Sequence, residues 1–538
     1  MKLRELLSRT EYTLTAGDPD VAITGLSRDN RTAKAGDLFI CTKGARFDTH
    51  DPEVVQTLAK AGVAAFLTER ELVLPEDCSA AVVRVPNTRE AGASVYAAWY
   101  GHPAGRMQVI GITGSKEKTT TAHMLYHVLK AAGRHPGIIG TNGVEYEKTV
   151  ADGDGKAAGR LEKVAFELAN TTPDYDRLQQ ILKDMADAGV DSCVLEVSSQ
   201  AMKLHRCGGF TFDCGIFMNI QEGDHVGPNE HETFEDYMAC KAALLNHSRT
   251  GLVNADDPYA DRFLRYIDEN LPLSFFSVDG VPVEQFDADG NFAGNAAHPA
   301  VCPGGKEADY RANNVHGVFD EAQGVPGIVF RTAGKVEDEF RIPFPGAFNV
   351  WNALAAIAAA DLLKIPADAV KRGLMNVHIK GRDDIVYKGR FSVCVDFAHN
   401  GASTRHHLEA LREYRPKRLI CIFGADGNRS KGRRYGMGEA AGALADLSIV
   451  TSGHNRWETF EAILADTEIG LRRTKGANYI AIKDREEAIR YAIEHAEDGD
   501  LITIIGLGHE SWQEDHGVKR RYNDEEFVKS VLREKGLL

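Results

Sequence analysis

Continuous apolar runs alternate with amphipathic stretches through the middle of the chain. Short apolar runs of this kind are typical of strands buried on both faces of a parallel sheet, and the stretch 175–188 has the apolar spacing of a helix. The pattern therefore predicts an α/β fold with helices on both faces of the sheet. Residues 279–308, rich in Gly, Asp, Ala and Pro, are expected to form an irregular surface excursion. The apolar runs are 107–110, 193–197, 214–218 and 251–253.

The N-terminal part has the same character but lacks a nucleotide motif. Residues 36–40 and 63–67 are predicted to be short strands between helices, and 101–105, with two glycines and a proline, has the composition of a linker. Residues 1–7 have the pattern of an amphipathic helix start rather than of a cleaved leader. We therefore expect a separate first domain over 1–104.

A third unit starts near residue 381 and contains three clear strands, at 391–395, 419–423 and 501–505. Each strand ends at a turn crowded with polar residues. Because ligands of open α/β sheets bind at the carboxyl ends of strands, these turns are candidate binding sites. We expect a central domain over 105–380 and a C-terminal, Rossmann-like domain over 381–538.

Composition limits the classes of function. A chain of 538 residues is too long for one ordinary core, and 43% hydrophobic with 26% charged residues is typical of a soluble globular protein. The net charge of −15 argues against a general nucleic-acid binder. No apolar run reaches the roughly 18 residues of a membrane span. Nine cysteines without CxxC spacing indicate reduced thiols in a cytoplasmic protein.

Residues 111–121, Gly-Ile-Thr-Gly-Ser-Lys-Glu-Lys-Thr-Thr-Thr, lie between a predicted strand and a predicted helix. This is the layout of a phosphate-binding loop, in which backbone N–H groups hold phosphate, Lys118 reaches the terminal phosphates and the Thr119 hydroxyl meets Mg²⁺. Glu117 stands where the usual pattern has glycine, so a strand–helix turn with an incidental lysine remains the alternative. If the loop binds phosphate, we expect Glu117 to point outward and to pair with Lys116 or another cation.

Further polar residues follow the later strands. Glu196 at a strand end could ligate Mg²⁺, and His225 could ligate a metal, although a solvated acid and a loop histidine are the simpler readings. Lys241 on a predicted helix would by itself be a solvated side chain. Asn349 and Asn352 share one helix face, where they could cap the helix or bind a base.

The order of these segments, taken together, resembles the Mur ligase family. These ATP-dependent enzymes add amino acids to UDP-N-acetylmuramoyl peptides, and the chain is most similar to the members that add the third, diamino residue. The resemblance covers nearly the whole chain. The matching segments are 25–31, 36–39, 170–173, 196–199, 224–225, Lys241 and 346–356.

The resemblance implies three binding sites, one for a UDP-sugar, one for ATP and one for an amino acid. It also implies the reaction that is common to the family. The γ-phosphate passes to the substrate carboxylate, and the resulting acyl phosphate is attacked by the incoming amine. It implies ATP contacts at Gly111, Gly114, Lys118, Thr119, Thr120, Asn254, Asp257, Asn349, Asn352, Arg382 and Asp396. UDP-sugar contacts are implied at Ser27, Arg31, Thr171, Thr172 and Ser198, and amino-acid contacts at Arg429, Arg456, Gly506 and Glu510.

It also implies catalytic roles for Lys118, Glu196, His225 and Lys241. Thr119, Glu196 and His225 would ligate Mg²⁺, and so would Lys241 once carbamylated. The implied reactants are ATP, a UDP-N-acetylmuramoyl-peptide and a free amino acid, handled by a cytoplasmic monomer whose third domain swings in to deliver the amino acid.

The chain departs from the family pattern at four places. Glu117 replaces the loop glycine, Gln200 a common histidine, and Leu507 the lysine of a Gly-Lys-Gly-His-Glu motif. The acceptor-reading loop is Gly-His-Asn-Arg at 453–456 rather than Asp-Asn-Pro-Arg. Retained Arg456, Arg429 and Glu510 would suit an amino acid with a distal carboxylate and amine. The alternative hypothesis is an impaired paralogue kept as a binding or regulatory protein.

Overall fold

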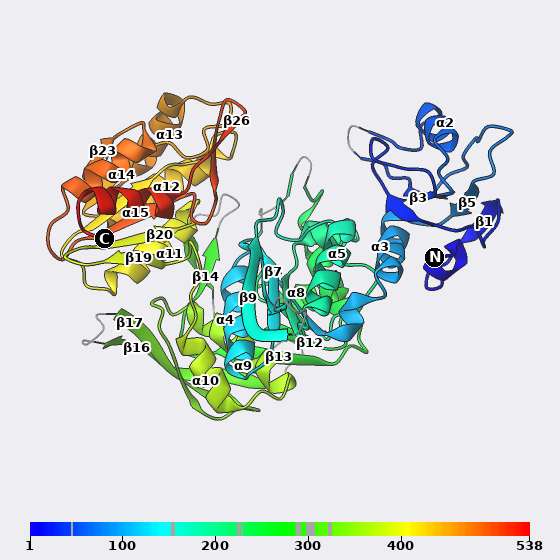
Figure 1. Ribbon diagram of the computed structural model, residues 1–538. Coiled ribbons are helices and arrows are strands. Elements are labelled where there is room, and N and C mark those ends of the chain that lie inside the picture. Colours follow the sequence, from blue (N-terminus) through cyan, green and yellow to red (C-terminus); the bar gives the residue numbers. More distant parts are fainter. Residues whose placement is uncertain are drawn as a thin grey trace.

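A computed structural model of the chain describes residues 1–44, 47–151, 157–222, 226–227, 230–286, 292–296, 307–320 and 325–538. Three large sheets follow one another along the chain, and each forms the centre of a separate lobe (Figure 1). The N- and C-termini lie in the two outer lobes, with the central lobe between them (Figure 1). The predicted α/β class with three domains is thus confirmed.

The first sheet has five strands in the order β1-β5-β4-β3-β2. The strands β2 to β5 are parallel and β1 pairs antiparallel at the edge. Strands β3 and β4 confirm the predictions at 36–40 and 63–67, and the predicted N-terminal helix forms as α1. The elements are α1 (Leu3–Leu6), β1 (Thr13–Ala16), β2 (Gly25–Ser27), β3 (Asp37–Ile40), α2 (Pro52–Lys60), β4 (Ala65–Thr68), β5 (Ala81–Arg84) and α3 (Thr88–Trp99).

The central sheet has eleven strands in the order β18-β17-β16-β13-β12-β11-β6-β10-β7-β8-β9. It is parallel from β16 to β7 and antiparallel at both edges. Its strands are β6 (Gln108–Thr113), β7 (Pro136–Gly140), β8 (Gly143–Ala151), β9 (Ala157–Phe166), β10 (Ser192–Glu196), β11 (Cys214–Phe217), β12 (Gly251–Asn254), β13 (Leu273–Val278), β16 (Tyr310–Asp320), β17 (Val325–Gly334) and β18 (Glu339–Ile342).

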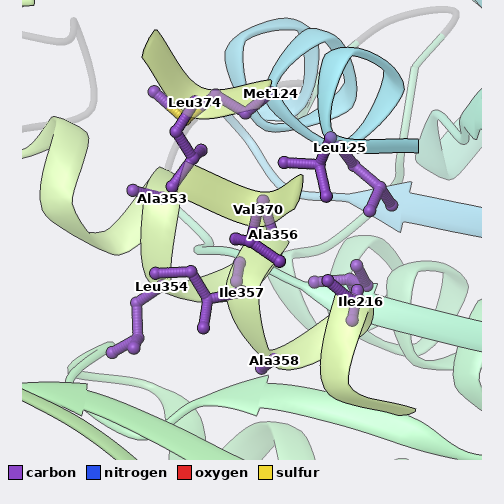
Figure 2. Packing of buried hydrophobic residues seen from close by; sticks show 14 of the residues in the cluster. Met124, Leu125, Ile216, Ala353, Leu354, Ala356, Ile357, Ala358, Val370 and Leu374 are labelled. Atoms are coloured by element: carbon purple, nitrogen blue, oxygen red, sulfur yellow. The ribbon is translucent and has the colours of Figure 1, made fainter. Parts of the chain in front are cut away.

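Two hydrophobic clusters cover the two faces of this sheet, because successive strand residues point to opposite sides. Ile110 and Ile112 of β6 join the cluster of α4 (Lys118–Ala131), α9 (Asn349–Leu362) and α10 (Ala367–Met375). Val109 joins the cluster of α5 (Tyr175–Asp187) and α7 (Phe234–Asn246). Figure 2 shows Ala353, Ala356 and Ile357 of α9 in the first cluster. The remaining helices of this domain are η1 (Pro103–Arg106), α6 (Ser199–Lys203), α8 (Ala260–Phe263) and η2 (Leu264–Tyr266).

The C-terminal sheet has six strands in the order β19-β20-β24-β21-β22-β23, parallel except for β19. Strands β20, β21 and β24 confirm the three predicted strands. The elements are β19 (Asp384–Lys388), β20 (Ser392–Asp396), α11 (Gly401–Arg412), β21 (Leu419–Phe423), α12 (Lys431–Leu444), β22 (Leu447–Val450), α13 (Phe460–Arg473), β23 (Tyr479–Ala481), α14 (Arg485–Glu494), β24 (Leu501–Ile505), β25 (Trp512–Asp515), β26 (Val518–Arg521) and α15 (Asp524–Glu534).

The structure contains strands that were not predicted. They include the parallel strands β5, β7, β13 and β16 and the antiparallel strands β8, β9, β17 and β18 at the two sides of the central sheet; β8 and β9 mix apolar with many polar residues. Within 279–308, expected to be irregular, β14 (Val283–Phe286) and β15 (Phe292–Ala296) form an antiparallel hairpin. None of the helices in the described ranges combines the length and hydrophobicity needed to cross a bilayer.

Candidate active site

The phosphate-type loop joins β6 to the N-terminus of α4. The Lys118 ammonium donates to the carbonyls of Gly114 at 2.6 Å and Ser115 at 3.1 Å. A Cβ at Gly114 would lie 2.8 Å from the Lys116 carbonyl, so the tight turn requires glycine there. Gly111 serves packing, since its Cβ would meet the Leu244 side chain at 2.6 Å. The N-terminus of α4, directed at the loop, favours an anion.

Glu196 lies next to this loop because β10 and β6 are neighbours in the sheet. Its side chain is buried, and its Oε2 accepts hydrogen bonds from the Thr119 hydroxyl at 2.9 Å and the Thr141 hydroxyl at 3.1 Å. Its Oε1 accepts from the Thr141 backbone N–H at 3.0 Å. Three hard oxygen donors thus meet beside the phosphate loop, which is the donor chemistry that Mg²⁺ prefers.

The two threonines of the Asn-Thr-Thr-Pro segment lie beside Glu196. The Thr172 hydroxyl donates to the Glu196 carbonyl at 2.9 Å and accepts from the Ser198 N–H at 3.0 Å. The Thr171 and Thr141 hydroxyls are 3.1 Å apart. The expected UDP-sugar residues of the central domain therefore border the expected metal-binding carboxylate.

Helix α7 closes the other side of the loop. Lys241 is buried, with its Nζ 4.6 Å from the centre of the Tyr237 ring, and the Tyr237 hydroxyl is 2.8 Å from the Ser115 hydroxyl. Burial removes the simple reading of Lys241 as a solvated side chain. His225 lies outside the described residues, so its expected metal role stays a prediction.

A cavity of about 590 Å³ opens beside the loop, between the central domain and α11. Glu117, Asn254, Asp257 and Asn352 are among the residues that line it. Burial raises the pKa of Asp257 to about 7, although its carboxylate accepts backbone hydrogen bonds from Ile220 and Tyr259. The volume of the cavity and its place next to the N-terminus of α4 suit a nucleoside attached to phosphates.

The asparagines expected to contact adenine each make hydrogen bonds to other parts of the protein in this region. The Asn254 amide donates to the Met218 carbonyl at 2.8 Å, and the Asn349 amide donates to the Pro345 carbonyl at 2.8 Å. Asn352 lies inside the helix α9 and bonds to Asn349 at 3.0 Å. Asn349 is helical too, so the capping alternative is wrong: the residue at the N-cap of α9 is Phe348.

The Glu117 carboxylate accepts a hydrogen bond from the Asn352 amide at 2.7 Å. We expected this carboxylate to point outward and to pair with a cation. It is instead bonded to a neutral amide in the wall of the cavity.

Two of the expected ATP residues belong to the start of the C-terminal domain. The Arg382 guanidinium lies 4.8 Å from the centre of the Phe397 ring. Asp396, at the end of β20, accepts hydrogen bonds from the backbone of Asp383 and Ala398. Burial raises the pKa of Asp396, a shift that His407 opposes.

The residues expected to bind the amino-acid substrate lie at the carboxyl ends of the strands of the C-terminal sheet. Arg456 pairs with Asp426 at 3.1 Å, and Glu510 Oε2 is 2.8 Å from His454 Nε2. Burial and neighbouring Arg456 lower the pKa of Arg429. Gly506, at φ +110°, has a backbone conformation that favours glycine.

The expected UDP-sugar residues of the first domain lie apart from the phosphate loop. The Ser27 hydroxyl donates to the Asp29 carbonyl at 3.1 Å, and Arg31 pairs with Asp29 on the surface. Between them in sequence, Arg28 bonds Asp174 at the start of α5 at 2.6 Å, which joins the first domain to the central one.

Family models match two long parts of the chain. The Mur ligase middle domain matches residues 112–360, and the Mur ligase, glutamate ligase domain matches residues 381–508. The chain belongs to the Mur ligase family. Members of this family are ATP-dependent ligases that form amide bonds, so the chain is an enzyme of that kind, as predicted.

Individual Mur ligases match over their full length. A relative from Clostridium perfringens is 30% identical over 99% of both chains, and one from Bacillus licheniformis is 33% identical over 99% of this chain and 100% of the relative. Both are named UDP-N-acetylmuramoyl-L-alanyl-D-glutamate–2,6-diaminopimelate ligase.

Solved structures share the fold. A ligase of the same name covers 100% of this chain and 99% of its own, with a TM-score of 0.66 and 23% identity. A MurF ligase from Thermotoga maritima in complex with ADP covers 96% and 98%, with a TM-score of 0.58 and 18% identity.

Several residues of the site were not predicted from the sequence. Gly140 ends β7 and Thr141 follows it, and no acidic residue at this strand end draws attention. His231 is fully buried, 2.9 Å from the Ser199 hydroxyl and 3.0 Å from Asp236. The signal that could have found it is its place in the polar stretch before α7, between the Asp-His pair and Lys241.

Proposed function

We propose that this Mur ligase joins a diamino acid to UDP-N-acetylmuramoyl-L-alanyl-D-glutamate in peptidoglycan precursor synthesis. ATP would phosphorylate the substrate carboxylate, and the amine of the amino acid would attack the acyl phosphate. The observation that carries the proposal is the contact of the Thr119 hydroxyl with the buried Glu196 carboxylate beside the phosphate loop. The names and full-length similarity of the relatives support the choice of substrates.

Each domain would contribute one reactant. The loop and the cavity beside α9 would hold ATP, with Lys118 turning from its loop carbonyls to the terminal phosphates. Thr171, Thr172 and Ser198, with Ser27 and Arg31 from the first domain, would contact the UDP-sugar. Most of the rate enhancement would come from positioning and from neutralising charge on the phosphates.

The donor set fits Mg²⁺. Thr119 and Glu196 would hold one ion, which would neutralise charge on the phosphates when bound. Lys241 carries an ammonium and cannot ligate a cation as it stands, so we infer that it is carbamylated, which gives it carboxylate-type oxygens. His225 completes the proposed metal set.

The C-terminal domain would select the amino acid. Arg456 and Arg429 would bind a distal carboxylate, and Glu510 and Gly506 would meet the distal amine. The His454 ring beside Glu510 stands in the acceptor-reading loop where the family pattern has asparagine, and it occupies one oxygen of that carboxylate. The enzyme would act as a monomer in the cytoplasm.

The test is release of phosphate from ATP with Mg²⁺, UDP-N-acetylmuramoyl-L-alanyl-D-glutamate and a panel of amino acids. We expect release to depend on a diamino acid such as diaminopimelate and on the sugar nucleotide together. If no amino acid stimulates release while the sugar nucleotide binds, the proposal fails. The impaired-paralogue alternative has no support: the described part of the metal set is retained, and the relatives are named as ligases.

A further inference from the structure

Glu117 holds an unusual backbone position at the N-cap of α4. Its φ of 68° and ψ of 0° lie in the left-handed region, which costs free energy for a residue with a Cβ. A glycine would adopt this conformation without that cost. The loop thus has the backbone conformation of a phosphate site, but the position whose left-handed conformation favours glycine carries a long acidic side chain.

The Glu117 side chain is held by the Asn352 amide, whose donors and acceptor are all hydrogen-bonded. Asn352 is fully buried in α9, and its Nδ2 donates to Glu117 Oε2 at 2.7 Å and to Asn349 Oδ1 at 3.0 Å. Its Oδ1 accepts from the Thr121 hydroxyl of α4 at 3.2 Å. Both amide hydrogens are therefore engaged, and the orientation of the Asn352 amide is fixed from two sides.

The side chains of Glu117 and Lys118 are directed apart. Lys118 bonds to the carbonyls of Gly114 and Ser115 at the beginning of the loop, whereas Glu117 reaches across to α9. Glu117 and Asn352 both line the cavity that we assign to ATP. The carboxylate is thereby bonded to the cavity wall rather than left to approach the phosphates.

We propose that Glu117 is a positioning residue of the ATP site. Its carboxylate ties the phosphate loop to α9 through Asn352 and holds the loop backbone in the left-handed conformation before the nucleotide arrives. Pre-ordering the loop lowers the entropy lost on binding. The inference rests on the proposed function, which places the ATP phosphates at this loop.

The test compares Glu117→Gln, which keeps an acceptor oxygen for Asn352, with Glu117→Gly, which relieves the strain but removes the tether. We expect the Kd of Mg²⁺–ADP by calorimetry and the KM for ATP to stay within about twofold for Glu117→Gln, and to rise about tenfold for Glu117→Gly. The kcat at saturating ATP should stay within about twofold for both. A merely structural defect would instead lower the active fraction and hence kcat.

Lys364→Gly is the matched control. Lys364 has a φ of 57°, just past the other end of α9, so glycine relieves the same kind of strain about 18 Å along the helix axis from Asn352. We expect it to leave the KM for ATP unchanged. A contact test adds Asn352→Asp, which sets two carboxylates against each other, and its combination with Glu117→Gln, whose amide can donate to the new aspartate. The double variant should bind ATP at least tenfold more tightly than Asn352→Asp does.

The outcomes separate this inference from the proposed function. Tighter or unchanged nucleotide binding by Glu117→Gly, with normal binding by the wild type, overturns the tether alone and indicates simple repulsion of the phosphates or no role. Failure of Glu117→Gln to rescue Asn352→Asp, in a folded double variant, also overturns it. A folded wild-type enzyme that binds no nucleotide overturns both the site and the tether.

Discussion

At the scale of single residues, the site depends on how Glu196 is held. The carboxylate is buried and accepts three hydrogen bonds, all from Thr119 and Thr141. Hydrogen bonds from neutral donors orient a carboxylate without neutralising it, so the charge stays available for a cation. The same arrangement fixes the Thr119 hydroxyl next to the phosphate loop.

Thr119→Val tests this arrangement, because valine keeps the shape but removes the hydroxyl. We expect kcat/KM for phosphate release to fall about 10- to 100-fold, the range for loss of a group that orients a metal site. Steady-state kinetics at several Mg²⁺ concentrations make the measurement, and the apparent requirement for Mg²⁺ should rise. Thr467→Val is the control, since Thr467 is a buried threonine of α13 that bonds only within its helix at Ile463. Equal losses in the two variants would contradict the prediction.

At the scale of elements, the parallel strands β6, β7 and β10 end at the same edge of the central sheet. β10 lies between β6 and β7, so Glu196 meets residues that follow both neighbours. Gly140 ends β7 directly beside Glu196, where a Cβ would lie 2.0 Å from Glu196 Oε1. Absence of a side chain at Gly140 is therefore a condition for the carboxylate to face Thr119.

Gly140→Ala should displace the Glu196 carboxylate. We expect the free energy of unfolding to fall by about 1–3 kcal/mol, the usual cost of overpacking. We also expect kcat to fall further than Gly105→Ala lowers it, because the displaced carboxylate no longer faces Thr119. Denaturant unfolding and phosphate-release kinetics measure the two effects. Gly105→Ala, where an added Cβ meets nothing within 4 Å, should leave both unchanged. Full activity of Gly140→Ala would show that the carboxylate can move without consequence.

At the scale of the whole molecule, the three units would share the proposed reaction, and they touch at a few points. We propose domain boundaries after residues 104 and 380. The Ser511 hydroxyl bonds Glu167 at 2.6 Å, the Gly346 N–H donates to the Glu413 carboxylate at 3.1 Å, and the Phe348 and His406 rings stack at 5.3 Å, so the C-terminal domain meets the central one through isolated contacts. Contacts of this kind allow the outer domain to move, as delivery of an amino acid to an acyl phosphate requires.

The cysteines report on the integrity of the first and central domains. Most of the described cysteines are buried, and burial raises the pKa of Cys41, Cys193, Cys207 and Cys214 to about 12, so these thiols stay protonated and unreactive at pH 8. We expect an aromatic disulfide reagent to label them only after denaturation, and the half-buried Cys78 to react in the native protein. Cys78→Ser should remove one fast-reacting thiol. Rapid labelling of all thiols in the native enzyme would contradict the packing of these cores.

Much of the fold could be predicted from the sequence, because its central strands are short and almost entirely apolar. The strands around 193–197, 214–218 and 419–423 were found within a residue or two of their ends. The strands β8, β9, β17 and β18 at the sides of the central sheet were missed, since such a strand needs one apolar face only and lacks a continuous apolar run. The parallel strands β7 and β13 were missed too, because Gly and Ser interrupt their apolar runs. The hairpin β14–β15 was missed because its Gly- and Asp-rich surroundings favour turns.

The site was predicted in outline and refined by the structure. Lys118, Thr119 and Glu196 follow strands with a recognisable polar ending, and the structure brings them to one sheet edge. The partner of Glu117 could not be predicted, because Asn352 is 235 residues away in the chain and reaches it only through the packing of α9 on α4.

The sequence by itself determined the α/β class, the phosphate loop and the resemblance to the Mur ligases, because each is written in local patterns of apolar strands, glycines and polar strand ends. Only the tertiary structure decided which distant groups meet. Burial of Lys241, the threonine cradle of Glu196 and the Glu117–Asn352 bond all arise where helices pack on the sheet. Such contacts depend on strand order and helix packing, which no local pattern encodes.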